Sequence, residues 1–550
     1  MDSLPTPSPL MGASSRRQFM QYLGAGAVCA AANRITPNWL TAQPVQTQAS
    51  QATPLFDDFS FQEVGKTLED AVTLPPGYKY EVILKHGDKI HPSGLQFGDQ
   101  ADYLAFHLEN DEAGWLWINH ENSFFLKGKE LLSDVGGSCI RLRKDAGSGK
   151  WRPDLTSQDN LRVNGLDTKI KLLGPAAGSK ALDGANEVVG SVGNCGGAVS
   201  PWGTFFSGEE NFYHFWGDFD NPKSMDAPLH GLPDDLQRNP RHYGWMVEVD
   251  PQTKEVFKHT ALGRFGHENI AFGFTKDGRL VGYMGDDRNA MGFYKFISRE
   301  KYDAAAGKGN RRLLSDGTLY VADTVNGRWI PLDPEQTPVL KEKGFDLAEI
   351  CVRTRVAVEF AGGTPLARPE DVEIHPETGE IYVCLTAYDN GTDNVGAIMV
   401  VREKEGDHGA LAFEHQVFVL GGKEAGLAWP DNIGFGPDNA LMVTTDYEVV
   451  EPPANSPHEW FGNNNLLIVP TKGEHRGQVR RFMSGPLGAE LCSPTLSPCR
   501  TELWVNVQHP GDGGRGHWPE GGTSQPRSAM IAISRLKNAE ERKPENLSGA

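Results

Sequence analysis

The sequence has no long hydrophobic run. Its mean hydropathy of −0.43 argues against a protein that crosses a membrane several times. The weakly apolar stretch at residues 20–32 is rich in Gly and Ala and is too short to span a bilayer. Cys29 has no apolar residue three positions before it, so a lipoprotein anchor is not expected. We therefore expect no stable membrane anchor.

Positive charge is also scarce. The chain has 53 Lys and Arg against 72 Asp and Glu, a net charge of −19. Nucleic acid is a poor partner for such a chain, because phosphate contacts need clustered Lys and Arg. A small anionic substrate would be repelled as well, unless bound metal ions reverse the local field.

Cysteine is sparse, with seven in 550 residues. Six of these follow residue 32, and none shows the close spacing of a disulfide framework or zinc site. Cys492 and Cys499 are the best candidate pair, because they flank a probable turn. We expect most of the others to be buried as small apolar residues.

The N-terminus resembles a twin-arginine export signal. Arg16 and Arg17 lie in a Ser-Arg-Arg-Gln-Phe run, and the weakly apolar stretch that follows ends in three alanines. We interpret residues 1–32 as a removable signal, residues 33–55 as a flexible linker and residues 56–550 as one catalytic propeller domain. The expected partner during export is the twin-arginine translocase, which carries folded proteins. The expected location is the periplasm or the extracellular space.

A repeated hairpin pattern dominates the rest of the chain. In residues 367–386, apolar residues alternate on both sides of a turn bearing Pro and Gly, which is typical of an antiparallel hairpin with one buried face. The same unit recurs after Glu268, Asp431 and Glu490, as it does after Glu370. Glu210 and Glu121 are two further possible starts, and most intervals are roughly 60 residues. Six such units predict an all-β protein, a six-bladed β-propeller with inserted loops and a short helix.

Two segments interrupt this pattern. Residues 213–243 are rich in Pro, Asp and His without alternation, and we expect them to form a loop over the channel mouth. Residues 345–353 have apolar positions three and four apart, which predicts the short helix. Directly afterwards, Val356, Val358 and Phe360 alternate as in a strand. Residues 529–534 are expected to be a closing strand.

If each acid opens the innermost strand of its blade, all of them converge at one mouth of the central channel. Carboxylates packed together raise one another's pKa unless cations lie among them. A polynuclear metal site is therefore the leading interpretation. The alternative is that these acids are solvated at loop tips.

The densest cluster of reactive residues lies at 194–211. Cys195 stands beside Gly196 and Gly197, and Glu209 and Glu210 follow about fifteen residues on, enough for a hairpin to return. Such a cysteine suits a thiolate ligand or a nucleophile. The alternative is a packed small apolar residue.

Several ordered motifs together resemble the PhoX-type alkaline phosphatases. They are Asn-Cys-Gly-Gly at 194–197 with Pro-Trp-Gly-Thr at 201–204 and Glu-Glu at 209–210, Gly-Arg-Phe-Gly-His-Glu at 263–268, Gly-Asp-Asp at 285–287, Arg-Pro-Glu at 368–370, and the 506–511 run. The resemblance covers nearly the whole mature chain. Residues 445–447 read Thr-Asp-Tyr where Thr-Asp-Gly is expected, which affects the expected substrate range more than metal binding.

The resemblance implies a six-bladed propeller whose central site holds two Fe(III) ions and several Ca(II) ions. By motif match, Cys195 would bind iron, and Glu268 and Glu370 would bind metal. Asp287 and either Glu209 or Glu210 would bind calcium, and Asp446 or Asp431 would complete the shell. Glu490, which opens the last repeat, joins this set. Arg368 would hold the phosphate, so Arg368 and Glu370 are the candidate catalytic residues.

The implied activity is the release of phosphate from phosphomonoesters by a secreted enzyme that acts as a monomer. Two alternatives stay open. One is a calcium-dependent propeller hydrolase of the lactonase or phytase type without iron, and the other is a non-catalytic propeller scaffold stabilised by calcium.

Overall fold

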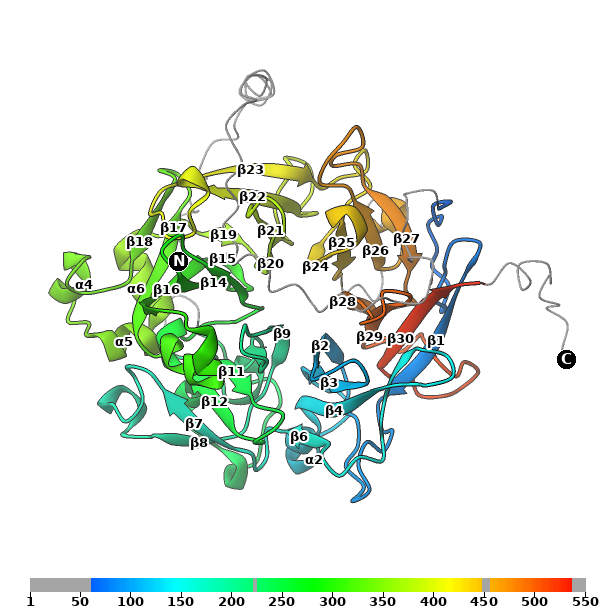
Figure 1. The fold of residues 1–550 in the computed structure, drawn as a ribbon, viewed down its shortest axis with the longest axis horizontal. Helices are drawn as coiled ribbons and strands as arrows, with labels where there is room; N and C mark the ends of the chain where they lie inside the picture. Colours follow the sequence, from blue (N-terminus) through cyan, green and yellow to red (C-terminus); the bar gives the residue numbers. More distant parts are fainter. Residues whose placement is uncertain (1–60, 221–224, 448–455, 537–550) are drawn as a thin grey trace, which may run out of the picture. The chain divides into compact units, whose positions relative to one another are not determined.

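The structure is a computed structural model that describes residues 61–220, 225–447 and 456–536. Strands dominate it, and six sheets are arranged around a common centre as the blades of a β-propeller (Figure 1). The all-β, six-bladed prediction is confirmed. The expected signal and linker, residues 1–55, lie outside the described residues. In the part that is described, no helix has the length and apolar character needed to cross a bilayer.

Each blade is built from strands that are close in the sequence. The first contains β2 (Ala101–Leu108), β3 (Ala113–His120), β4 (Gly136–Lys144) and β5 (Trp151–Pro153), with β6 (Leu161–Val163) beside β4. The second contains β9 (Asn194–Val199), β10 (Phe205–Glu209), β11 (Met246–Val249), β12 (Val256–His259), β7 (Lys169–Leu173) and β8 (Glu187–Val189). The third contains β13 (Ala271–Phe274), β14 (Arg279–Gly285), β16 (Phe293–Lys301), β17 (Gly317–Asp323) and β18 (Arg328–Pro331).

The last three blades have four strands each. They are β20 (Pro369–Ile374), β21 (Ile381–Leu385), β22 (Ala397–Glu403) and β23 (Phe413–Leu420); β24 (Pro430–Phe435), β25 (Leu441–Thr445), β26 (Asn465–Val469) and β27 (Arg480–Ser484); and β28 (Glu490–Leu496), β29 (Leu503–Gln508), β30 (Ala529–Arg535) and β1 (Tyr78–Lys85). A separate short ribbon pairs β15 (Asn289–Met291) with β19 (Leu366–Ala367).

The ring closes through its terminal strands. β30 pairs antiparallel with β1, from Tyr78 opposite Arg535 to Lys85 opposite Ala529, so the sixth blade joins both ends of the described chain. This confirms the predicted closing strand. Closure of the ring leaves each blade with only a short outer edge strand.

Apolar side chains fill the space between neighbouring sheets. Trp117 of the first blade stacks on Phe205 of the second with ring centroids 6.1 Å apart. Tyr382 of the fourth blade and Leu467 of the fifth belong to one buried cluster. Face-to-face packing of this kind fixes the positions of the innermost strands, and hence of the residues at their ends.

Helices are short and lie in the connections between strands. They are α2 (Gly128–Asp134), α3 (Tyr213–Trp216), α4 (Pro338–Glu342), α5 (Leu347–Val352), α6 (Thr354–Ala361) and α7 (His458–Phe461), with 3₁₀ turns at Lys180–Leu182, Asp234–Leu236, Pro240–His242, Thr260–Leu262, Ala304–Leu314, Lys404–Gly406 and Pro437–Asn439. Helix α5 confirms the predicted short helix.

The strand-like alternation at Val356, Val358 and Phe360 is misleading, because these residues lie in α6. The helix buries Arg355, whose guanidinium donates to the Asp286 carboxylate. The helix thus carries an ion pair to the third blade. Because this contact joins distant segments, the local alternation of apolar residues could not predict the helix.

Candidate active site

The hairpin geometry brings two rings of residues to one end of the channel. In an antiparallel hairpin, the start of the first strand lies beside the end of the second. Pro430 pairs with Thr445, so Asp431 and Asp446 lie at the same end of the fifth blade. Glu490 pairs with Gln508 in the sixth blade in the same way. The mouth is therefore lined from two sets of strand termini.

The prediction that every repeating acid opens an innermost strand is wrong for two of them. Glu121 and Glu210 follow β3 and β10, which are the second strands of their blades. On the innermost strands, Asp102 is the second residue of β2 and Cys195 is the second residue of β9. Because both ends of a hairpin reach the same mouth, the acids still converge, but Asp102 was missed. The pairing of β2 with β3 is the signal that identifies it.

A cavity of about 550 Å³ occupies this mouth. Among the predicted residues, its lining includes Cys195, Glu210, Glu268, Asp287, Arg368, Glu370, Asp431, Asp446 and Glu490. Asp102, Glu121 and Gln508 line it as well, and the sequence analysis assigned no site role to Asp102 or Gln508. Cys195, Glu268 and Glu370 thus lie around one cavity, as a shared metal site requires.

Glu209 is placed elsewhere. Its carboxylate lies 2.8 Å from the ammonium of Lys258, and both side chains are 0% exposed. It also accepts hydrogen bonds from the backbone N–H groups of Gly244 and Trp245. The two adjacent glutamates therefore differ, because Glu210 lines the cavity and Glu209 forms a buried ion pair.

Carboxylates crowd the floor of the cavity. Ligand atoms of Glu268, Glu370 and Asp431 lie within 4.8 Å of one another, and all three residues are buried. The Cys195 Sγ lies 3.1 Å from both Asp102 Oδ2 and Glu268 Oε2. Thiol and carboxylate donors at such distances could share bound cations.

The electrostatics of the cluster favour cations. Burial, and then the charge of Glu370, raises the pKa of Glu268 well above its usual range. Burial raises the pKa of Asp431 well above its usual range too, with Glu490 adding to the shift. The pKa of Asp102 rises to about 8 through burial and the charge of Glu121. Cations would keep these groups ionised, so the donor set fits a polynuclear metal site.

Arg368 faces this cluster from the rim. Its guanidinium donates to both Asp287 carboxylate oxygens at 2.8 Å and lies 2.7 Å from Glu370, while its side chain keeps 30% exposure. The residue has a φ of 49°, which is uncommon for a residue with a Cβ and costs about 1–3 kcal/mol. The guanidinium outweighs burial at Asp287 and holds the pKa of that carboxyl below its usual value. This geometry suits an anion-binding group held beside metal ligands.

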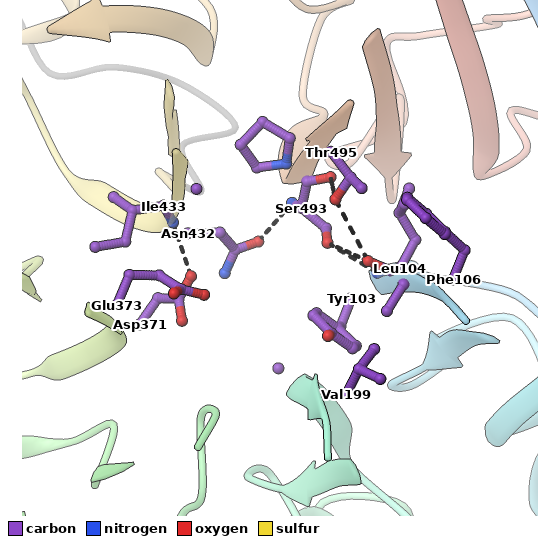
Figure 2. Close-up of a pocket in the computed structure, with 14 residues that line it drawn as sticks. Tyr103, Leu104, Phe106, Val199, Asp371, Glu373, Asn432, Ile433, Ser493 and Thr495 are labelled. Carbon is purple, nitrogen blue, oxygen red and sulfur yellow. Dashed lines mark hydrogen bonds between the residues drawn. The ribbon is translucent and has the colours of Figure 1, made fainter. Parts of the chain in front are cut away.

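A second cavity, of about 250 Å³, is lined by residues farther along the innermost strands, including Tyr103, Asp371, Glu373 and Asn432 (Figure 2). The Asp371 carboxylate accepts hydrogen bonds from the backbone N–H groups of Ile433 and Val372. None of the residues described around this cavity is Lys or Arg. A phosphate-like anion would find no cationic side chain in this second cavity. The mouth cavity that Arg368 lines is therefore the candidate active site.

Comparison with known proteins decides the family. The family model for alkaline phosphatase PhoX matches residues 59–511. The chain belongs to the PhoX alkaline phosphatase family. The search of curated protein sequences found no match.

Among solved structures, Pseudomonas fluorescens PhoX in complex with vanadate, a transition state analogue, is similar to this PhoX family member. It has 29% identity and a TM-score of 0.79 over 86% of this chain and 98% of that one. A gluconolactonase of Xanthomonas campestris is 10% identical, with a TM-score of 0.33 over 89% and 99% of the two chains. A likeness that weak assigns no function.

The cysteines of this PhoX family member differ from one expectation. Cys492 and Cys499 form no disulfide, and all six described cysteines are free. Cys492 lies instead beside Glu490, with Sγ 3.2 Å from Oε1. Cys139, Cys351 and Cys384 are buried in apolar clusters, as predicted.

Aromatic side chains surround the same cavity. Phe124, Tyr213, Trp429 and Tyr447 contribute to its lining, and Trp429 stacks on Tyr447 with centroids 3.6 Å apart. Tyr213 belongs to the segment expected to cover the mouth. Phe124 is 53% exposed.

Proposed function

We propose that this PhoX family member is an exported, metal-dependent phosphatase that hydrolyses phosphomonoesters at an iron and calcium site in the propeller mouth. The observation that carries the proposal is the position of Arg368, a partly exposed guanidinium directly above packed, buried carboxylates. A site with such acids alone would repel phosphate. With cations among the acids and an arginine at the rim, it attracts and orients phosphate.

Cys195 is the proposed iron ligand, because thiolate is a soft donor that calcium does not favour. Glu268 and Glu370 join it, and Glu210, Asp287 and Asp431 or Asp446 supply hard oxygens for calcium and ferric iron. Glu490 belongs to the same set. When bound, these metals supply charge neutralisation for the phosphoryl oxygens and a positioned nucleophile.

Arg368 has the proposed catalytic role of binding the phosphoryl group. Its planar guanidinium presents two parallel N–H donors to Asp287 in the structure, and the same fork fits two phosphoryl oxygens. Glu370, 2.7 Å from that guanidinium, holds it over the site. The fork thereby restricts the angle at which a phosphoester can enter.

Residues 1–32 are proposed to direct export through the twin-arginine translocase, after the propeller of residues 56–550 has folded with its metals. The mature protein would work in the periplasm or outside the cell, as a monomer without a membrane anchor. A fusion of residues 1–55 to a reporter that must fold before export tests the signal. Replacing Arg16 and Arg17 with Lys should block its export.

Elemental analysis and a phosphatase assay test the function together. The purified mature protein should contain iron and calcium and release p-nitrophenol from p-nitrophenyl phosphate, and a chelator should abolish turnover. Arg368→Lys should retain its metals and lose about 10²- to 10³-fold in kcat/KM, as when a single charge-stabilising donor is removed. A metal-loaded wild type without phosphatase activity would exclude the proposal.

The calcium-only hydrolase alternative is tested by Cys195→Ser. Under the proposal, this variant loses iron, colour and turnover together. Full turnover without iron would favour the lactonase or phytase type. A non-catalytic scaffold would show no phosphatase activity in the wild type either.

A further inference from the structure

A second thiol lies in the mouth, at the seam between the first and the sixth blades. Asp102 is near the start of β2, and Glu490 and Cys492 are near the start of β28. One ligand atom from each lies within 4.8 Å of the other two. Their exposed fractions are 1%, 8% and 0%. This cluster includes none of the trio Glu268, Glu370 and Asp431 described above.

Apolar packing does not explain Cys492. Cys139, Cys351 and Cys384 lie within apolar clusters, and Cys499 packs against another. Cys492 has its Sγ 3.2 Å from the Glu490 carboxylate. In this respect it resembles Cys195, whose Sγ also lies against carboxylates. A thiol among buried acids is poorly placed as an apolar residue, and suitably placed as a metal ligand.

Three buried oxygens around this cluster accept no hydrogen bond from any residue that the structure describes. They are Asp102 Oδ1, Asn506 Oδ1 and Gln508 Oε1. Asn506 is the cross-strand partner of Cys492, and Gln508 is that of Glu490, so the amides belong to the same part of the sheet. Buried acceptors are normally satisfied by a donor or an ion. Together these oxygens offer acceptors that a bound cation would satisfy.

The amide orientations leave those oxygens available. The Gln508 amide nitrogen donates to Asp102 Oδ2 at 3.0 Å and to Glu121 Oε2 at 2.8 Å. The Asn506 amide nitrogen donates to the Asp102 backbone carbonyl. With both nitrogens engaged in this way, each carbonyl oxygen is the free end of its amide.

We propose that Asp102, Glu490 and Cys492 bind a transition-metal ion of their own, as a second thiolate-ligated position beside that of Cys195. One soft thiolate with hard carboxylate and amide oxygens favours a transition metal over calcium. The thiol proton leaves to solvent as the Sγ–metal bond forms. Asp102 Oδ2 faces the Cys195 Sγ at 3.1 Å, which makes Asp102 a bridge between the two thiolate positions. The proposal extends the metal site proposed above and does not depend on phosphate hydrolysis.

Cobalt loading tests the second position without an activity assay. The metal-stripped full-length mature protein would be titrated with Co²⁺, and the thiolate-to-cobalt charge-transfer absorption recorded. The wild type should reach about twice the absorption of Cys492→Ser or Cys195→Ser, and the double variant should show none. Cys139→Ser is the matched control, a buried cysteine in an apolar cluster, and should match the wild type. An unchanged absorption in a folded Cys492→Ser variant would overturn the proposal.

A measurement on the wild type guards against misfolding of the variants. X-ray absorption at the cobalt edge should show sulfur ligation that saturates at two cobalt ions per chain, whereas saturation at one sulfur-ligated ion would overturn the proposal. Failure of the two proposals is distinguishable. Two thiolate-bound ions without phosphatase activity exclude the proposed function alone, and activity with one thiolate-bound ion excludes only the second position.

Discussion

Replacing each of the adjacent residues Glu209 and Glu210 by Gln should have opposite consequences. Glu209 ends β10 and pairs with Lys258 inside the second blade, where both side chains are fully buried. Glu210 lines the mouth cavity. Glu209→Gln should therefore destabilise the fold and leave the metal content unchanged. Glu210→Gln should reduce metal binding with little effect on the metal-free fold, because it removes one of several repelling charges.

The size of the Glu209→Gln effect follows from the surroundings of Lys258. In the variant, the Lys258 ammonium still donates to the carbonyls of Gly190 and His242. It has lost the negative charge of Glu209. Burial already lowers the pKa of Lys258 in the wild type. The side chain can shed its proton, which from an unfolded pKa of about 10.4 costs at most about 4.6 kcal/mol at pH 7. This limit agrees with about 3–5 kcal/mol for breaking a buried pair.

The effect should shrink at alkaline pH. If Lys258 is neutral in the folded variant, the unfolded state binds one more proton, so stability rises with pH up to about 10.4. At pH 9, deprotonating Lys258 costs at most about 1.9 kcal/mol of folding stability. With about 2 cal/mol/K of unfolding entropy per residue, a body the size of Ala52–Ala550 changes its Tm by about 1 °C per kcal/mol. The Tm should fall by about 3–5 °C at pH 7 and about 2 °C at pH 9.

Calorimetry of the metal-free proteins at both pH values measures this difference, and elemental analysis of the loaded proteins measures metal content. Glu209→Gln combined with Lys258→Met should recover part of the lost stability, because no unpaired charge is left in the blade. A Glu209→Gln variant that keeps the wild-type Tm but loses metal would refute the assignment of Glu209 to the fold.

Three further outcomes are expected. Chelation should lower the Tm, and calcium and iron together should restore it, since ligand at a hundred times its dissociation constant adds about 2.7 kcal/mol; a Tm indifferent to chelator would contradict metal binding in the mouth. His86 lies 3.3 Å from Asp134; burial lowers its pKa, but this hydrogen bond and the charge of Asp99 outweigh burial and raise the pKa overall. The stability that protonated His86 contributes is full below about pH 6.5 and is lost as the pH rises through its raised pKa. The free energy of unfolding of His86→Gln, measured with urea, should therefore lack this pH-dependent decrease. Phe124→Ala should raise KM for p-nitrophenyl phosphate about fivefold, the equivalent of about 1 kcal/mol of ring contact, and leave KM for glycerol phosphate unchanged; equal effects on both esters would remove Phe124 from leaving-group contact.

Alternation along the strands was sufficient to predict the hairpins. Glu370, Asp431 and Glu490 were placed at the starts of innermost strands because apolar residues alternate after each of them. The expectation of a single buried face is wrong there, because consecutive residues on both faces of these strands are buried between the blades. The same pattern does not reveal whether an acid precedes the first strand or follows the second. Glu121 and Glu210 were placed on the wrong strand for that reason.

Contacts between distant segments could not be predicted. Asp102 belongs to the mouth because β2 lies next to β28 in the ring, although these strands are far apart in the sequence. The pairing of Glu209 with Lys258 joins β10 to β12 across β11. Such neighbours depend on how the sheets pack, and no local signal in a single sequence identifies them.

The sixth blade draws three strands from the C-terminal part of the chain and its outer strand, β1, from the start of the described residues. A nascent chain that has not yet released Ala529–Arg535 from the ribosome cannot complete this blade. Until then Asp102 at one end of the open arc and Glu490 at the other have no fixed separation. If ions bind across that seam as proposed above, they can be captured only once β30 has joined the blade, so metal loading would follow ring closure.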